Sequence, residues 1–244
     1  ATSNLIVKVR TTDPYVGPVD TIELYGVVAP GAIKKVQDAY SFHASNHIPD
    51  GHNILYDLIC IDGTQNWSSG FTVQAHAPVM VLDNYSVNDS TGNNNGRLDP
   101  GETDHLKIFI KNSGSSEAYN VIGHLISINP FVTILQDQFG YGNIAGGDST
   151  FQTFTVQVDS LAPEGQTAPF MLEINADKGI TGSGSFNLVI GKIPALIVDF
   201  DLNTNSGPAM KSAIEELNLS ADYTTANIPD SLDQYSSVFV CLGT

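Results

Sequence analysis

Basic residues are scarce in this sequence. Its 244 residues include only 10 Lys and Arg against 26 Asp and Glu, which gives a formal net charge of −16 at pH 7. Nucleic-acid binding depends on cationic side chains that neutralise phosphates, so we expect no nucleic-acid partner. The excess of carboxylates suits either a solvated acidic surface or the binding of cations.

Long apolar runs and cysteines are also few. No run approaches the roughly 18 apolar residues that a membrane-spanning helix needs, so we expect no membrane span. Cys60 and Cys241 lie in two separate apolar, strand-like segments and are expected to be buried and unpaired. Motifs such as Gly-x-Ser-x-Gly and His-Glu-x-x-His do not occur, and we expect no catalytic residue in this chain.

The most informative feature is an internal repeat at a spacing of 114 to 116 residues. Four landmarks recur in the same order: Asp13-Pro14-Tyr15-Val16 as Asn129-Pro130-Phe131-Val132, Tyr25-Gly26 as Tyr141-Gly142, Pro49-Asp50-Gly51 as Pro163-Glu164-Gly165, and Phe71-Thr72-Val73 as Phe186-Asn187-Leu188. Short alternating segments separated by turn residues predict strands in both copies. In the second copy these are 105–111, 120–128, 150–159, 170–176 and 185–190.

This spacing of strands is typical of an immunoglobulin-like sandwich. We therefore predict a mostly β chain of tandem immunoglobulin-like β-sandwiches, with an incomplete repeat at residues 1–78 and a complete repeat at 79–192. Residues 4–7 already match residues 120–122, so we expect the chain to start inside a module and to be a fragment.

The pattern changes after residue 193. Residues 195–199 form a continuous apolar run, which is typical of a parallel strand buried on both faces. A predicted amphipathic helix at 208–217 is followed by a second apolar strand at 237–242. We predict one β-α-β unit, the truncated start of an α/β domain at 193–244.

One loop contains a motif with specific chemistry. Calcium loops of the EF-hand kind place oxygen ligands at alternate positions, a glycine at the sixth position and a bidentate glutamate at the twelfth. If Gly96 is that glycine, the ligands would be Asn93, Asn95, the Arg97 carbonyl, Asp99 and Glu102. Thr91 stands at the first position, where Asp is usual, and Asp89 could replace it.

The expected cofactor is thus one structural Ca²⁺. The alternative is an Asn/Gly-rich turn without a metal, because Asn and Gly tolerate positive φ. Two further groups are weaker candidates. His43, His47 and His52 cluster in sequence, but they lie in a strand and a turn. Asp199 and Asp201 end the first parallel strand, where we favour a structural or capping role.

Several of these features together resemble a known family. Asn93-Asn94-Asn95-Gly96-Arg97-Leu98-Asp99-Pro100-Gly101-Glu102-Thr103, Lys111-Asn112-Ser113-Gly114 and the repeated Tyr-Gly and Pro-x-Gly landmarks resemble modules found beside the catalytic domains of secreted Bacteroidetes peptidases, both gingipain-type and subtilisin-type. The similarity covers roughly residues 1–192, and residues 195–240 resemble the flavodoxin-like domain that often follows such modules. The resemblance implies export through the type IX system and a secreted or cell-surface location. No catalytic residue is carried over.

Two functions remain open from the sequence. The chain is either a non-catalytic accessory and spacer region of a secreted or surface bacterial peptidase, or part of a surface adhesin or carbohydrate-binding protein without an enzymatic domain. The expected partners are other domains of the same parent chain, or a surface glycan or protein. Trp67 could serve as a sugar platform in the second case, although a lone Trp more often packs in a core or loop.

Overall fold

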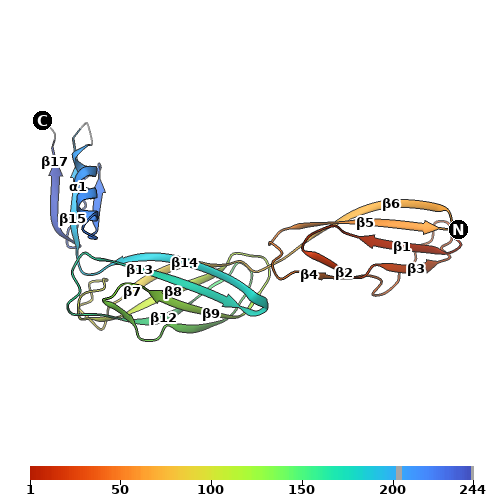
Figure 1. The fold of residues 1–244 in the computed structure, drawn as a ribbon, viewed down its shortest axis with the longest axis horizontal. Coiled ribbons are helices and arrows are strands. Elements are labelled where there is room, and N and C mark those ends of the chain that lie inside the picture. Colours follow the sequence, from red (N-terminus) through yellow and green to blue (C-terminus); the bar gives the residue numbers. More distant parts are fainter. Residues whose placement is uncertain (202–204, 243–244) are drawn as a thin grey trace.

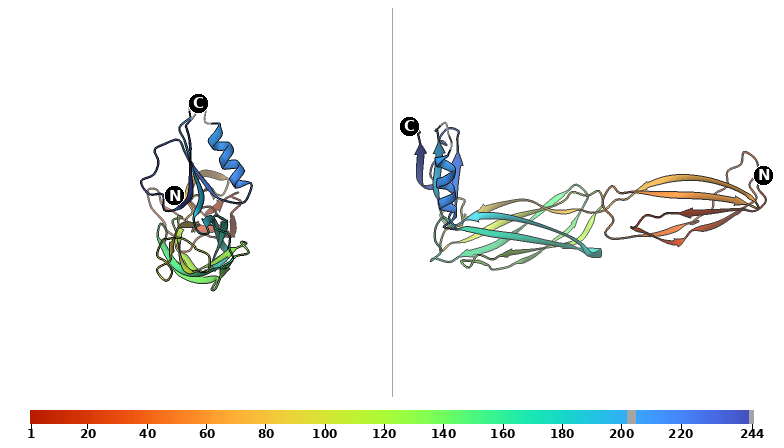
Figure 2. Two further views of the ribbon diagram at one scale, coloured as in Figure 1. Left: turned by 90° about the vertical axis from the view of Figure 1, so that its left-hand side faces the viewer. Right: turned by 45° about the horizontal axis from the view of Figure 1, so that its top comes forward.

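The computed structural model describes residues 1–201 and 205–242. The molecule is elongated, with two β units in line and a smaller α/β unit at the C-terminal end (Figure 1). The right-hand view of Figure 2 shows the same arrangement, with the N-terminus at the end far from the C-terminal unit. The chain is mostly β, because short alternating segments dominate the sequence.

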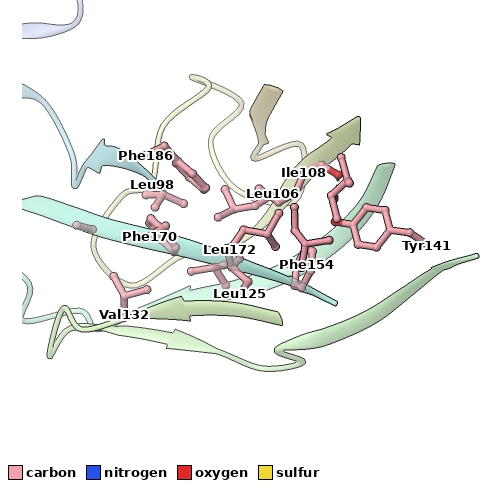
Figure 3. Close-up of a cluster of buried hydrophobic side chains, with 14 of the residues drawn as sticks. Leu98, Leu106, Ile108, Leu125, Val132, Tyr141, Phe154, Phe170, Leu172 and Phe186 are labelled. Atoms are coloured by element: carbon pink, nitrogen blue, oxygen red, sulfur yellow. Dashed lines mark hydrogen bonds between the residues drawn. The ribbon is translucent and has the colours of Figure 1, made fainter. Parts of the chain in front are cut away.

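The middle unit has the largest core. Its strands are β7 (Met80–Asn88), β8 (Thr103–Asn112), β9 (Ala118–Ser127), β10 (Val132–Ile134), β11 (Gln138–Ile144), β12 (Ser149–Val158), β13 (Thr167–Ala176) and β14 (Ile180–Val189), with a short 3-10 helix (Asp177–Gly179) before β14. In β8 every second residue is buried, which produces the inward apolar row Leu106, Ile108 and Ile110. Figure 3 shows Leu106 and Ile108 inside the unit together with Phe154, Phe170 and Leu172.

The prediction of a two-sheet immunoglobulin-like sandwich is wrong for this unit. All eight strands join in one hydrogen-bonded sheet of order β10-β12-β8-β7-β14-β13-β9-β11, which curls around the core. The two predicted sheets are connected because β7 and β14 meet in parallel at Val81 and Ser183. Glycines at 182 and 184 permit this approach, since a Cβ at Gly182 would lie 2.1 Å from the Met80 carbonyl oxygen.

The N-terminal unit is smaller. It contains β1 (Leu5–Arg10), β2 (Val16–Asp20), β3 (Ile22–Gly26), β4 (Ser41–Ala44), β5 (Asn53–Asp62) and β6 (Gln65–Gln74). These strands form a four-stranded sheet, β3-β1-β5-β6, and a two-stranded sheet, β2-β4. A small core of Val9, Val16, Ile48, Ile54 and Tyr56 lies between them.

The C-terminal unit contains β15 (Ile193–Asp199), α1 (Ser206–Glu215), β16 (Ala221–Thr224) and β17 (Tyr235–Cys241). Its sheet is parallel with the order β16-β15-β17, and α1 packs on one face through Met210 and Ile214. The central strand β15 is buried because α1 covers one face and Tyr235 packs against the other.

The predicted β-α-β unit, in which 237–242 is the strand after the helix, is not formed. The strand that follows the helix is β16, which the sequence analysis did not identify. The predicted second strand is β17, and it pairs with β15 on the side opposite β16. A four-residue strand has too little apolar alternation to be recognised from sequence. The predicted loop residues 202–204 lie outside the described part of the chain.

Candidate metal site

The loop singled out in the sequence analysis connects β7 to β8 at residues 89–102. It begins with a turn in which the Gly92 amide donates to the Asp89 carbonyl oxygen at 2.7 Å, and it ends with one in which the Glu102 amide donates to Asp99 O at 3.2 Å. Asn94 and Gly96 adopt left-handed conformations, with φ of 58° and 79°. Asn and Gly tolerate this region, so these residues allow the loop to fold back on itself.

Asp89 is the centre around which the loop folds. Its side chain is 2% exposed, and Oδ2 accepts hydrogen bonds from the main-chain amides of Asn95 at 2.6 Å and Gly96 at 3.0 Å. Thr91, at the first position of the motif, instead donates its hydroxyl to the Thr103 carbonyl oxygen. Asp89 therefore holds the inward position that the spacing alone would give to Thr91.

Asn93, Asn95 and Asp99 lie together on the loop. Both asparagine side chains donate their amide nitrogens to Asp99 Oδ2, at 2.7 Å from Asn93 and at short range from Asn95. Their amide oxygens accept the main-chain amides of Asn95 and Arg97. In this arrangement the two asparagines present nitrogen, not oxygen, to Asp99, so both amides would have to turn before their oxygens could bind a cation.

Glu102 and Asp104 lie beside these residues and are incompletely satisfied. Within the described residues, Glu102 Oε2 and both carboxylate oxygens of Asp104 are buried without a hydrogen-bond partner. Buried oxygens of this kind normally have a partner, because an unpaired one costs about 1–3 kcal/mol or more if charged. The Glu102 carboxyl group also packs closely on Gly92, where an added Cβ would lie 2.8 Å from Glu102 Cδ.

Asp104 is fully buried, and its carboxyl group is surrounded by negative charge. Burial, followed by repulsion from Glu102, Asp89 and Asp99, raises its pKa to about 7. The sequence analysis missed this residue because it lies beyond the twelve-residue motif. A signal was present: Asp104 stands at an inward position of β8, in phase with Leu106, Ile108 and Ile110, where a charge is out of place.

The chemistry of the donors fits a hard cation. The carboxylates of Asp89, Asp99, Glu102 and Asp104 lie at one end of the unit, and carboxylate oxygens are ligands that Ca²⁺ prefers. In the described ranges, 1–201 and 205–242, no group of three His, Cys, Asp or Glu side chains is arranged to hold a metal ion. The four carboxylates would have to draw together around the ion.

The next candidate is the group of His43, His47 and His52. His52 Nε2 lies 2.6 Å from Asp13 Oδ2, and its ring packs edge-on against Tyr15. This contact and the Tyr15 amide lower the pKa of Asp13. Asp13 and His52 therefore join two loops of the N-terminal unit, and within the described residues neither belongs to a cluster with His43 and His47 that could hold a metal ion.

Asp199 has a structural environment. It is 2% exposed, and its Oδ2 accepts the main-chain amide of Gly207 at 3.3 Å and the hydroxyl of Tyr223 at 3.2 Å. Asp201 Oδ2 accepts the Ser206 hydroxyl at the start of the same helix. The bond to Gly207 satisfies one main-chain amide in the first turn of α1. Cys60 and Cys241 are both free thiols.

Comparison with known proteins adds little. No family model matches the chain, and no curated protein matches it. Among solved structures, the chain is similar to a Niemann-Pick type C2 protein from Japanese carpenter ant, with 12% identity and a TM-score of 0.28 over 46% of this chain and 92% of that one. A likeness this distant carries no argument about ligand or activity. No helix within the described residues is long and apolar enough to cross a membrane.

Proposed function

We propose that this chain is a non-catalytic, calcium-stabilised spacer and accessory region of a secreted or cell-surface bacterial peptidase. The observation that carries the spacer role is the way the units are joined: each junction is fixed by packed main chain and by hydrogen bonds between units. A spacer holds other domains at a defined separation only if its own joints resist bending.

The first joint is built around Asp50. Its Oδ1 accepts the main-chain amide of Ala77 at 2.8 Å and the hydroxyl of Ser115, and so joins the N-terminal unit to the loop between β8 and β9. The Ser115 amide donates to Ala77 O at 3.1 Å. A Cβ at Gly114 would lie 2.2 Å from the Ala77 carbonyl oxygen, so the segments around Ala77 and Gly114 are in direct main-chain contact. The joint is therefore held by hydrogen bonds and close main-chain contact in addition to the connecting chain.

The second joint is similar in kind. The Ser220 amide donates to Gly165 O at 2.9 Å, and the hydroxyls of Thr167 and Ser220 are 2.8 Å apart. Gly165 packs against Pro194, since an added Cβ would lie 2.1 Å from the proline Cγ. The turn of the Pro163-Glu164-Gly165 landmark therefore meets the next unit, as the turn at Pro49-Asp50-Gly51 meets the middle unit.

Calcium would stabilise the end of the middle unit that faces the C-terminal unit. The loop reaches this junction through Leu98, whose carbonyl oxygen accepts the Gly191 amide at 2.6 Å. A cation among Asp89, Asp99, Glu102 and Asp104 would neutralise the buried charge there. Binding only to the folded state stabilises by about 2.7 kcal/mol at a hundredfold excess over Kd.

The peptidase context rests on the resemblance of residues 93–103 and 111–114 to peptidase-associated modules. The alternative, a surface adhesin or carbohydrate-binding protein, is favoured by one observation. Trp67 and Phe71 on β6 are 51% and 44% exposed, and exposed aromatic rings are common platforms for sugars. Mass spectrometry of the full-length parent separates the two: a peptidase domain in the same chain supports the first function, and a parent without one overturns it.

The rigidity of the first joint can be measured directly. Spin labels on exposed residues of the two β units, at Ser68→Cys and Ser183→Cys in a chain with Cys60 and Cys241 replaced by Ala, should give one narrow distance distribution. Asp50→Ala combined with Ser115→Ala should broaden it, whereas Asp57→Ala, an exposed carboxylate of the same unit, should not. A broad distribution in the unaltered joint would remove the basis for the spacer role.

A further inference from the structure

The hydrogen bonds of the N-terminal unit recur in the middle unit. The amides of Gly51 and Gly165 donate to Ala75 O and Ile190 O, and the amides of Ser45 and Asp159 donate to Tyr15 O and Phe131 O. Strand pairing repeats as well, since Val16 faces Ala44 in β2-β4 as Val132 faces Val158 in β10-β12. Thus β3-β1-β5-β6 corresponds to β11-β9-β13-β14, position by position.

Two strands of the middle unit have no equivalent among the described residues of the N-terminal unit. These are β7 and β8, which lie between β14 and β12. Leu106, Ile108 and Ile110 of β8 are fully buried and form the centre of the core. In the N-terminal unit the corresponding space lies open between β6 and β4, both of which are edge strands.

One side of this opening shows the effect of the missing partner. In the middle unit all ten residues of β12 are strand, paired with β8 from Ser149↔Lys111 to Gln157↔Thr103. The equivalent strand β4 is only four residues long, and the preceding residues, 35–40, form no strand. Without a neighbouring strand, the main-chain groups of this segment have no ladder to join.

The other side of the opening is an incomplete aromatic stack. In the middle unit Phe186 lies between Phe170 and Tyr85 of β7, with ring centroids 5.2 and 4.1 Å apart. The equivalent Phe71 stacks on Tyr56 at 5.1 Å, but its other face is open. Phe71 is 44% exposed, whereas Phe186 is 7% exposed. The N-terminal unit thus has two rings of this stack, Tyr56 and Phe71, and lacks a third ring in the place of Tyr85.

We propose that the open side of the N-terminal unit is an acceptor site for a polypeptide hairpin of two antiparallel strands. One strand pairs with residues 35–44 and inserts a row of alternating aliphatic side chains into the core, as β8 does. The other lies along β6 and places an aromatic ring on Phe71, as Tyr85 does on Phe186. Strand addition at the β4 edge supplies main-chain hydrogen bonds, and the inserted side chains supply apolar burial.

The surface also sets a preference for its occupant. Trp67 and Ser69 of β6 stand where β14 has Gly182 and Gly184, the two glycines on which β7 packs closely. A strand lying on β6 therefore cannot approach the Trp67 end as β7 approaches Gly182. The occupant covers the half of β6 from Phe71 to Gln74 and leaves room for the indole ring.

A hairpin fits this site better than a second copy or a glycan. Two copies of a chain with a net charge of −16 repel each other, which opposes direct pairing of two β6 edges. A glycan would stack on the aromatic rings but would not bury the apolar core that β8 fills in the middle unit.

The test supplies such a hairpin to the full chain. A synthetic peptide of residues 84–112 retains Tyr85 and the β8 row and contains no tryptophan, so Trp67, the only tryptophan, reports binding by fluorescence. A second arm joins residues 84–117 directly ahead of Thr2, which reproduces the connection that precedes Ala118. In both arms, with calcium present, the Trp67 emission should shift to shorter wavelength. Amide exchange at 35–44 and 71–74 should slow by roughly a hundredfold.

Matched controls identify the site. A peptide in which Leu106, Ile108 and Ile110 are replaced by Ser should have no effect, and Phe71→Ser in the chain should weaken binding at least tenfold. Leu55→Ser, on the exposed side of β5, should leave binding unchanged. Unchanged amide exchange at both segments in both arms would overturn the proposal. So would protection of β6 through dimers of the chain alone, or a fluorescence shift with oligosaccharides that exceeds the shift with the hairpin.

Discussion

Replacing Asp104 by Asn is the sharpest test of the candidate metal site, because it removes a buried charge without changing the shape of the side chain. Asp104 has a pKa of about 7 in the folded protein against an ordinary value of 3.8. The folded state therefore binds this proton more tightly than the unfolded chain does. As a result, ionising Asp104 opposes folding as the pH rises.

The magnitude follows from the two pKa values. Below pH 3.8 the carboxyl group is protonated in both states and the substitution should have almost no effect on the free energy of unfolding. Between pH 3.8 and about 7 the destabilisation of the wild type grows, and above pH 7 it is complete. At about 1.4 kcal/mol per pH unit the full difference is at most about 4 kcal/mol, since water near the neighbouring carboxylates screens part of the repulsion.

The measurement is urea unfolding of wild type and Asp104→Asn in chelator at pH 4 and pH 8. We expect the variant to be more stable at pH 8 by a few kcal/mol and equal at pH 4. In calcium the order should reverse, because the variant loses a charged ligand. Asp83→Asn, which alters an exposed carboxylate on β7, serves as the control and should leave the free energy of unfolding unchanged in chelator and in calcium. A variant that is less stable than wild type in chelator at pH 8 would refute the idea that this charge is buried without compensation.

Four other predictions follow from the same structure. Melting should shift upward with calcium and downward with chelator in the wild type, and Glu102→Gln should remove that difference; equal melting temperatures in both conditions would contradict a calcium site. Gly114→Ala should lower the stability of the first joint by about 1–3 kcal/mol through overpacking against Ala77, and a neutral result in thermal unfolding would show that this joint is loose. Amide exchange should be faster in β5 than in β13, because the N-terminal core is much smaller, and the opposite order would argue against an open acceptor side. The chain should not turn over peptide or ester substrates, and turnover that disappears on mutating one of its residues would contradict the non-catalytic function.

The sequence by itself determined the local features of this protein. Alternating apolar residues located most strands of the middle unit, because a period of two marks a half-buried strand wherever it occurs. The Asn/Gly loop at 89–102 was recognisable since its turn residues and oxygen donors are neighbours in the chain. The helix of the C-terminal unit was placed within two residues of its start, at Ser206 instead of Pro208.

Only the tertiary structure decided which strands pair and which side chains converge. The single curled sheet depends on contact between β7 and β14, which lie about a hundred residues apart and meet because Gly182 and Gly184 carry no side chain. The short strand β16 exists because β15 offers it a ladder, and its sequence alone gives little sign of it. Asp104 joins Asp89, Asp99 and Glu102 for a similar reason: the pairing of β8 turns it inward, to a place where its charge has no partner. Contacts of this kind depend on long-range pairing, which a local pattern does not record.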